Sequence, residues 1–275
     1  MRSIAFALVA VACGLAVGEE RMPTPAQSLV QSDRVLVIAH RGASGAAPEN
    51  TLPAFQRAIE IGVDLIELDY YHTADGVPVA FHDKNLRRTT NARQVLGDDS
   101  LSISQITWEQ AQQLDAGLWF SPQFKGVRLP TLEQSLDLIQ TGSVTLVERK
   151  AGDAETLVRL LTEKNLLDRV VVQAFDWAYL ADCRRLAPSL ALGALGDKAI
   201  TPERIEQLKR LNVQAIGWSH KDLNAEVIAE LHRHGWKVWA YTVNDEQRGK
   251  ELIAAGIDGL ITDYPDRIKR LLAAE

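Results

Sequence analysis

Short, nearly continuous apolar runs alternate with helical segments along most of the chain. Such runs, separated by helices, indicate a parallel sheet covered on its outer face. Eight of them predict a closed (β/α)8 barrel. The alternative is an open doubly wound sheet, but no Gly-rich dinucleotide fingerprint follows the first run. The predicted strands are Val35–His40, Leu65–Tyr71, Val144–Lys150, Val170–Phe175, Leu190–Leu195, Ala215–Ser219, Val238–Val243 and Gly259–Thr262. The predicted helices include Thr51–Ile61, Ala154–Lys164, Trp177–Leu186, Pro202–Leu211, Ala225–His234 and Asp245–Ala255.

One further apolar run, Val77–His82, does not fit this alternation. It follows the second strand after only Thr73–Gly76, which is too short for a parallel crossover but suits the turn of an antiparallel hairpin. A turn centred on Ala74 and Asp75 sets His82 opposite Glu67, to within about one residue. We therefore expect a β-hairpin off the second strand that brings these two side chains together.

About sixty residues lie between His82 and the third barrel strand, which is too many for one crossover helix, and the candidate insertion comprises residues 85–130. They contain a helical stretch, Thr107–Leu114, and the aromatic segment Gly117–Phe120. We expect a small inserted subdomain near the mouth of the barrel, where long functional loops of this fold collect.

The beginning of the chain has a different character. A basic Arg2, an apolar run from Ile4 to Ala12 and small residues up to Gly18 are typical of a secretory signal. We therefore predict a signal peptide at 1–18, a polar linker at 19–32 and one barrel domain at 33–275. The mature protein is expected to be exported, periplasmic or secreted. The alternative is a lipoprotein anchored through Cys13, since Ala10–Cys13 loosely resembles a lipoprotein cleavage box.

Composition limits the partners that can be expected. The net charge of −6 and the lack of a Lys/Arg cluster give no basic surface for nucleic acid. No later apolar stretch has the length of a transmembrane helix. Without the leader one cysteine remains, Cys183, which the helical pattern predicts to be a buried thiol. The expected partner is a small molecule.

Three carboxylates are expected at one end of the barrel. Glu67 and Asp69 lie two residues apart on a strand and so point to the same face, and Glu148 ends the neighbouring strand. Carboxylates gathered inside a core repel one another and lose solvation, and a cation relieves both costs. Oxygen donors without cysteine suit Mg²⁺ or Ca²⁺ better than zinc. The alternative is a buried ion-pair network that includes Lys150.

His40 and His82 each end an apolar strand near these carboxylates. Two histidines beside a phosphorus centre can divide general acid and general base catalysis near neutral pH. Arg41 and Lys150 can stabilise charge on phosphoryl oxygens. The alternative for His40 is a hydrogen-bonded histidine of the core, and the alternative for Arg41 is a plain surface charge.

Several short motifs occur in an order and spacing that resemble the glycerophosphodiester phosphodiesterase family. They are Ala39–Gly42, Pro48–Thr51, Glu67–Asp69, Thr73–Gly76, His82–Asp83, Leu86–Thr90, Leu129–Leu132, Thr242–Asn244 and Thr262–Pro265. The resemblance covers roughly residues 35 to 270. Within Pro48–Thr51, Asn50 or Thr51 can equally be a simple helix cap.

The resemblance implies a distorted TIM barrel, related to that of phosphatidylinositol phospholipase C, which hydrolyses glycerophosphodiesters to glycerol 3-phosphate and an alcohol. It implies Glu67, Asp69 and Glu148 as ligands of one divalent cation, His40 and His82 as the acid–base pair, and Arg41 and Lys150 as phosphate ligands. It places Tyr241, where the family often has Trp, against the glycerol moiety. Two other functions stay open: a lysophospholipase D or phospholipase-like activity on lipid, and an inactive phosphodiester-binding protein.

Overall fold

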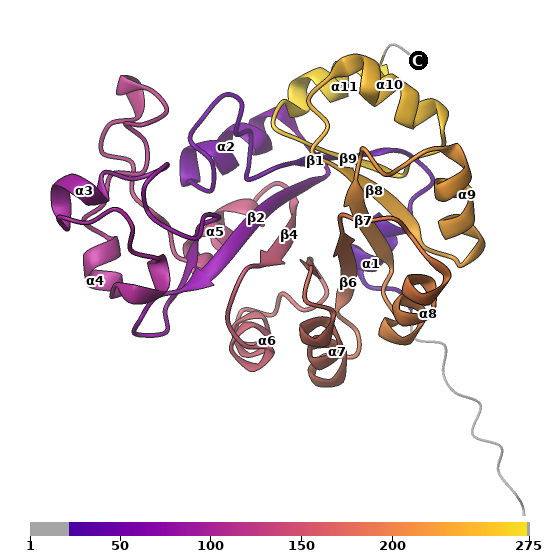
Figure 1. The fold of residues 1–275 in the computed structure, drawn as a ribbon, viewed down its shortest axis with the longest axis horizontal. Helices are drawn as coiled ribbons and strands as arrows, with labels where there is room; N and C mark the ends of the chain where they lie inside the picture. Colours follow the sequence, from indigo (N-terminus) through magenta and orange to yellow (C-terminus); the bar gives the residue numbers. More distant parts are fainter. Residues whose placement is uncertain (1–21, 274–275) are drawn as a thin grey trace, which may run out of the picture.

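The computed structural model describes residues 22–273 and shows a closed barrel (Figure 1). Its eight parallel strands follow one another around the ring, which closes where β1 pairs with both β9 and β2. The predicted (β/α)8 barrel is therefore confirmed. The barrel strands are β1 (Leu36–Ala39), β2 (Leu65–His72), β4 (Val144–Arg149), β5 (Val170–Ala174), β6 (Ala191–Gly196), β7 (Ala215–Ser219), β8 (Lys237–Tyr241) and β9 (Gly259–Thr262).

Helices cover the outside of this ring because each buries one apolar face against the strands. Leu157 and Leu161 of α6, for example, are almost completely buried, and Asp153 caps the helix by accepting from the amide of Thr156. The outer helices are α2 (Leu52–Ile61), α5 (Leu132–Ile139), α6 (Ala154–Glu163), α7 (Trp177–Leu186), α8 (Pro202–Leu211), α9 (Ala225–Arg233), α10 (Glu246–Ala254) and α11 (Pro265–Ala273).

The predicted hairpin is present as β3 (Pro78–Ala80), which pairs antiparallel with the end of β2 outside the ring. Tyr70 pairs with Ala80, and the amide of Phe81 donates to the carbonyl of Asp69 at 3.1 Å. Continuing this register sets His82 beside Leu68, one residue from the predicted partner and within the stated tolerance. The hairpin thus carries His82 to the carboxyl end of the barrel.

The inserted subdomain extends from β3 to one side of the barrel (Figure 1). It contains α3 (Ala92–Val95), α4 (Trp108–Ala111) and two 3-10 turns, η1 (Ile103–Gln105) and η2 (Pro122–Phe124). Its buried side chains, such as Leu86, Ile103 and Leu114, form a separate core together with Val79 and Phe81. The insertion therefore packs on the hairpin that carries His82.

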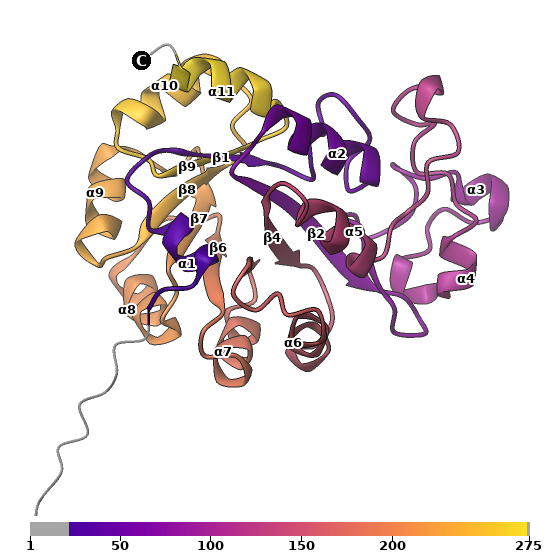
Figure 2. The ribbon, with the colours of Figure 1, turned by 180° about the vertical axis from the view of Figure 1, so that it is seen from behind.

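The expectation of a polar linker up to residue 32 is wrong for part of this segment. Residues Pro25–Val30 form a helix, α1, which Thr24 and Gln27 start with a reciprocal capping box. Ala26 and Val30 are buried against the first residues of the barrel strands, including Leu36 and Leu65. Figure 2 shows α1 lying across the barrel. It closes the end of the barrel opposite the carboxyl ends of the strands. Its buried residues, Ala26 and Val30, are too few to show a helical period in so short a sequence.

The predicted signal peptide, 1–18, and Cys13 lie outside the described residues. Within residues 22–273, none of the helices is long and apolar enough to cross a membrane. Cys183 is a buried free thiol in α7, as predicted.

Candidate active site

Three buried carboxylates meet at the carboxyl ends of β2 and β4. Glu67 and Asp69 share a face of β2, and the parallel register pairs Asp69 with Glu148. Their exposed fractions are 1%, 1% and 7%. One oxygen atom from each lies within 4.8 Å of the others, which is close enough for all three to bind one ion. The geometry that the sequence predicted for these residues is present.

Two cations lie against the carboxylates. The backbone amide of Arg41 donates to Glu67 Oε2 at 2.8 Å, and its Nε lies 3.1 Å from Asp69 Oδ2. Lys150 Nζ lies 3.1 Å from Asp69 Oδ1 and also contacts Glu148. The two cations do not satisfy every oxygen, because Glu67 Oε1 is buried without a hydrogen-bond partner. This unpartnered oxygen distinguishes the cluster from a complete ion-pair network.

The cluster strongly perturbs the pKa values of its members. Burial, together with the charges of Asp69 and Glu148, raises the pKa of Glu67 well above its usual value. Burial and the charge of Asp69 raise the pKa of Glu148 to about 7. Burial also opposes ionisation of Asp69, but Lys150 and Arg41 outweigh it and hold the pKa of Asp69 below its usual value. The site therefore holds more negative charge than it can stabilise by itself, and a divalent cation would relieve it.

Asn50 fixes Asp69 in place. Its side-chain amide donates to Asp69 Oδ2 at 2.9 Å, and its carbonyl oxygen accepts from the Asp69 backbone amide at 3.1 Å. Thr51 precedes α2 but makes no capping bond with its side chain, which donates to the carbonyl of Pro48. The helix-cap interpretation of this motif is therefore wrong. Asn50 belongs to the site.

Each of the two histidines is bound to a carboxylate through Nδ1. His40 Nδ1 lies 2.7 Å from Asp263, and His82 Nδ1 lies 2.7 Å from Asp83. Asp263 in turn accepts from Ser44 Oγ at 2.9 Å and from the side-chain amide of Asn244 at 2.6 Å. A carboxylate at Nδ1 fixes the orientation of the ring and leaves Nε2 for chemistry. Burial, opposed by the charge of Asp69, lowers the pKa of His82.

Both histidines, both cations and two of the three carboxylates line one cavity of about 230 Å³. His40, Arg41, His82, Glu148 and Lys150 are among the side chains that form its polar half. The other half is apolar and is formed mainly by Phe175, Leu195, Tyr241 and Ile261. The rings of Tyr241 and Phe175 pack edge to face with their centroids 6.0 Å apart. The Tyr241 hydroxyl donates to the carbonyl of Gly196 at 2.7 Å. The cavity thus joins a charged site to an aromatic wall.

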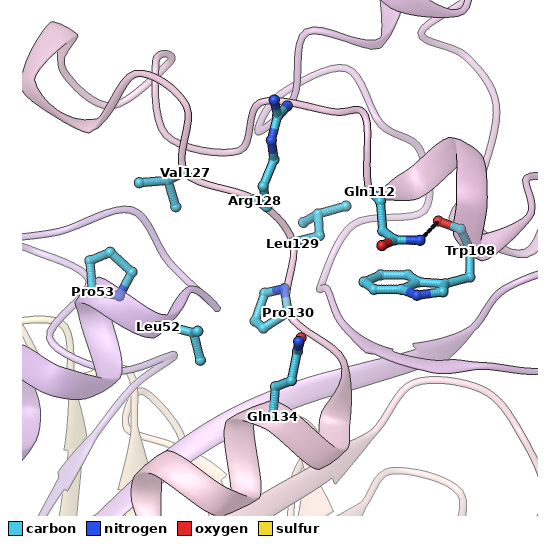
Figure 3. Close-up of a pocket in the computed structure, with 9 residues that line it drawn as sticks. All are labelled: Leu52, Pro53, Trp108, Gln112, Val127, Arg128, Leu129, Pro130 and Gln134. Carbon is cyan, nitrogen blue, oxygen red and sulfur yellow. Dashed lines mark hydrogen bonds between the residues drawn. The ribbon is translucent and has the colours of Figure 1, made fainter.

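A second hollow, of about 350 Å³, lies outside the barrel between α2, α4, α5 and residues 127–130 (Figure 3). Leu52, Trp108 and Pro130 line it, together with Arg128 and two glutamines. It is larger than the barrel cavity, but no carboxylate or histidine lines it. It therefore offers no acid–base or metal-binding groups.

The structure brings all the predicted site residues together. Asp69 alone does not line the cavity, because it lies beneath Lys150 and Arg41. Sequence reasoning did not assign roles to Asp83 and Asp263. Both stand in motifs that carried the family resemblance, yet only the fold shows that they face the histidines.

Comparison with known proteins agrees with this geometry. Residues 40–267 match the model of the glycerophosphoryl diester phosphodiesterase family. A glycerophosphodiester phosphodiesterase of Caldanaerobacter subterraneus is 34% identical over 246 residues, which cover 87% of this chain and 98% of the relative. One from Bacillus subtilis is 34% identical over 262 residues, with 87% of each chain covered.

Solved structures show the same similarity in three dimensions. A phosphodiesterase of Oleispira antarctica, determined in complex with the product sn-glycerol-3-phosphate, superposes with a TM-score of 0.77 and 29% identity. The match covers 86% of this chain and 96% of that one. A glycerophosphodiester phosphodiesterase of Agrobacterium tumefaciens gives a TM-score of 0.73 at 26% identity, covering 88% of this chain and 100% of the other.

Proposed function

Because the chain belongs to the glycerophosphoryl diester phosphodiesterase family and is an enzyme of that class, we propose that it hydrolyses glycerophosphodiesters to sn-glycerol 3-phosphate and an alcohol. The observation that carries this proposal is a cluster of three buried carboxylates, two of which line the same cavity as two carboxylate-bound histidines. The structure of the Oleispira relative in complex with the product sn-glycerol-3-phosphate supports the proposed product.

Glu67, Asp69 and Glu148 would hold one divalent cation, Mg²⁺ or Ca²⁺. The donor set contains only oxygen, and the unpartnered Glu67 Oε1 is available to a ligand. When bound, the cation neutralises developing charge and lowers the pKa of an attacking hydroxyl. With all three carboxylates ionised, these three and the cations Arg41 and Lys150 carry a net charge of −1, which a bound divalent cation would turn into +1. That charge complements one phosphodiester anion.

The histidines would move protons at the two sides of the phosphorus centre. Asp263 and Asp83 hold Nδ1 of His40 and His82, so Nε2 of each ring can give or take a proton. The lowered pKa of His82 favours its neutral form near neutral pH. Arg41 and Lys150 would hold the phosphoryl oxygens, and Tyr241 would contact the glycerol moiety from the aromatic wall.

A second candidate function is hydrolysis of lysophospholipids. Phe175, at the cavity, is 46% exposed, and Leu118 and Trp119 of the insertion are 41% and 38% exposed. Exposed aromatic and aliphatic side chains offer contact to an acyl chain. Water-soluble diesters remain the first choice, because only Phe175 among these three residues lines the cavity.

The test is a panel of glycerophosphodiesters and lysophospholipids with added Mg²⁺ or Ca²⁺, in which released glycerol 3-phosphate is quantified. We expect turnover of the soluble diesters, its loss on chelation and its return with the cation. Glu67→Gln should lose metal affinity and activity together. The matched control Glu60→Gln, on the exposed face of α2, should lose neither. Absence of turnover with every substrate excludes the proposed activity, and full activity after chelation excludes the cation.

We also propose that the enzyme is exported and that its leader is cleaved between about residues 12 and 19. Intact-mass measurement of the mature protein tests this proposal. Cleavage after Gly18 removes Cys13, whereas lipoprotein processing makes Cys13 the acylated first residue. An uncleaved chain recovered from the cytosol contradicts both outcomes.

A further inference from the structure

Arg88, in the first turn of the insertion after β3, binds two carboxylates at once. Its Nη1 and Nη2 donate to the two oxygens of Glu49 at 2.5 and 2.7 Å. Its Nε and Nη2 donate to the two oxygens of Asp83 at 2.7 and 2.8 Å. One guanidinium therefore forms two bidentate pairs, which fix geometry better than a single contact does.

Each of these carboxylates leads on to a different part of the active site. Asp83 Oδ1 is 2.7 Å from Nδ1 of His82. Glu49 Oε1 accepts from Nη1 of Arg41 at 2.8 Å, and Arg41 in turn contacts Asp69. Arg88 thus stands between the histidine at the end of the hairpin and the arginine at the end of β1. Within residues 22–273, no other chain of hydrogen bonds and ion pairs links these two side chains.

We propose that Arg88 is a positioning residue for the hydrolysis, setting the placement of His82 relative to Arg41 through Asp83 and Glu49. This inference rests on the proposed function, because it assigns His82 and Arg41 to the reaction. Arg88 itself does not line the cavity and is not a catalytic residue.

The surroundings of Arg88 separate it from an ordinary surface ion pair. The side chains of Glu49 and Asp83 are only 11% and 20% exposed. The Trp119 ring lies 5.7 Å from the guanidinium, and its indole nitrogen is fixed by a bond to the carbonyl of Ala116. One carboxylate oxygen of Glu49, one of Asp83 and a ring nitrogen of His82 lie within 4.8 Å of one another. Without the charge of Arg88, the carboxylates of Glu49 and Asp83 would repel each other.

The two histidines should respond differently to the loss of Arg88. Asp263, the partner of His40, is held by Ser44 and Asn244. Asp83, the partner of His82, is held by Arg88. Removing the guanidinium should therefore free the His82 ring and leave the His40 ring in place. A general loss of structure would disturb both rings.

The variant Arg88→Met keeps the apolar stem beside Trp119 and removes all four hydrogen bonds. Its matched control is Arg87→Met, because the Arg87 side chain is 63% exposed and makes one ion pair, with Asp99 at 3.4 Å. With the soluble diester and the cation, Arg88→Met should lose kcat by on the order of 10²-fold, with a smaller change in KM. Arg88→Lys keeps one charge but cannot form both forks, so its kcat should be intermediate. Arg87→Met should match the wild type.

Histidine ring signals in NMR spectra give a readout that needs no turnover. In Arg88→Met, at a temperature where the variant is folded, the His82 signal should shift and broaden, while the His40 signal should stay near its wild-type position. Wild-type kcat in Arg88→Met, or equal disturbance of both histidines, overturns the proposal. If Arg88→Met does not fold, the same two readouts on Arg88→Lys decide. If the wild type turns over no substrate, the proposed function fails, and the NMR signals still test whether Arg88 positions His82.

Discussion

Asn50 and Asp69 are joined by two hydrogen bonds that run in opposite directions, one from the Asn50 side chain and one from the Asp69 backbone. The pair binds Asp69 Oδ2 and leaves Oδ1 directed to Lys150, 3.1 Å away. Asn50 adopts a left-handed backbone with φ of 54°, a conformation that asparagine tolerates better than most residues. This backbone conformation places the Asn50 side chain where it can bond both the Oδ2 atom and the backbone amide of Asp69.

Asn50→Ala should weaken metal affinity and activity by roughly 10- to 100-fold, the usual effect of losing a partner of a metal ligand. Isothermal titration with Mg²⁺ or Ca²⁺ and kinetic assays measure the two losses. The substitution also places alanine at a positive φ. Asn165→Ala is the matched control, because Asn165 is exposed and has a φ of 55°. If both variants lose affinity equally, backbone strain explains the effect and the hydrogen bonds do not.

The histidines should act as a pair. His40→Ala and His82→Ala should each reduce kcat by roughly 10²–10⁴-fold, the range for general acid–base catalysis. The double variant should lose little more than either single variant, since an acid without its base contributes little. His232→Ala serves as the control, because His232 pairs with Asp258 away from the cavity. A strictly multiplicative double variant contradicts a shared mechanism.

Metal binding should strengthen as pH rises. In the metal-free site burial and Asp69 raise the pKa of Glu148 from 4.5 to about 7, so its folded-state stability contribution is present below 4.5 and is lost as pH approaches 7. A cation needs the ionised carboxylate and should restore stability there. Thermal unfolding with and without the cation, at about pH 5 and about pH 8, should show the larger metal-induced gain at the higher pH. In Glu148→Gln this pH dependence should largely disappear.

Helix α1 should contribute to stability without contributing to catalysis. Val30 is 1% exposed against the first residues of the strands, at the end of the barrel opposite the active site. Val30→Asp buries an unpaired charge and should lower the free energy of unfolding by at least ~2 kcal/mol. Ser28→Asp, on the exposed face of the same helix, is the control. Below its melting temperature Val30→Asp should keep wild-type kcat, and a loss of kcat there would place α1 in the catalytic machinery.

Sequence periodicity was sufficient to predict the barrel and the hairpin, because β-strands and their turns have recognisable patterns in the local sequence. The spacing of Glu67 and Asp69 also predicted their shared face, and the ends of neighbouring strands predicted the place of Glu148. Other features depend on contacts between distant segments. His40 meets Asp263 across 223 positions, and no local pattern encodes that pairing.

Helix α1 was missed for a related reason. Its six residues are too few to show an amphipathic period, and its stability comes from packing on the barrel. Asn50 was ambiguous because asparagine before a helix usually serves as a cap. Only the position of Asp69 in space distinguishes the two roles.

The hairpin gives the two histidines different mechanical supports. His40 follows a strand of the closed ring, whereas His82 follows β3, whose other side packs on the core of the insertion. Changes in the length or packing of the insertion can therefore shift the position of His82, while the ring keeps the three carboxylates in place. In such an arrangement, substitutions in the hairpin and the insertion can change the reactivity of the site without altering the barrel strands that hold the three carboxylates.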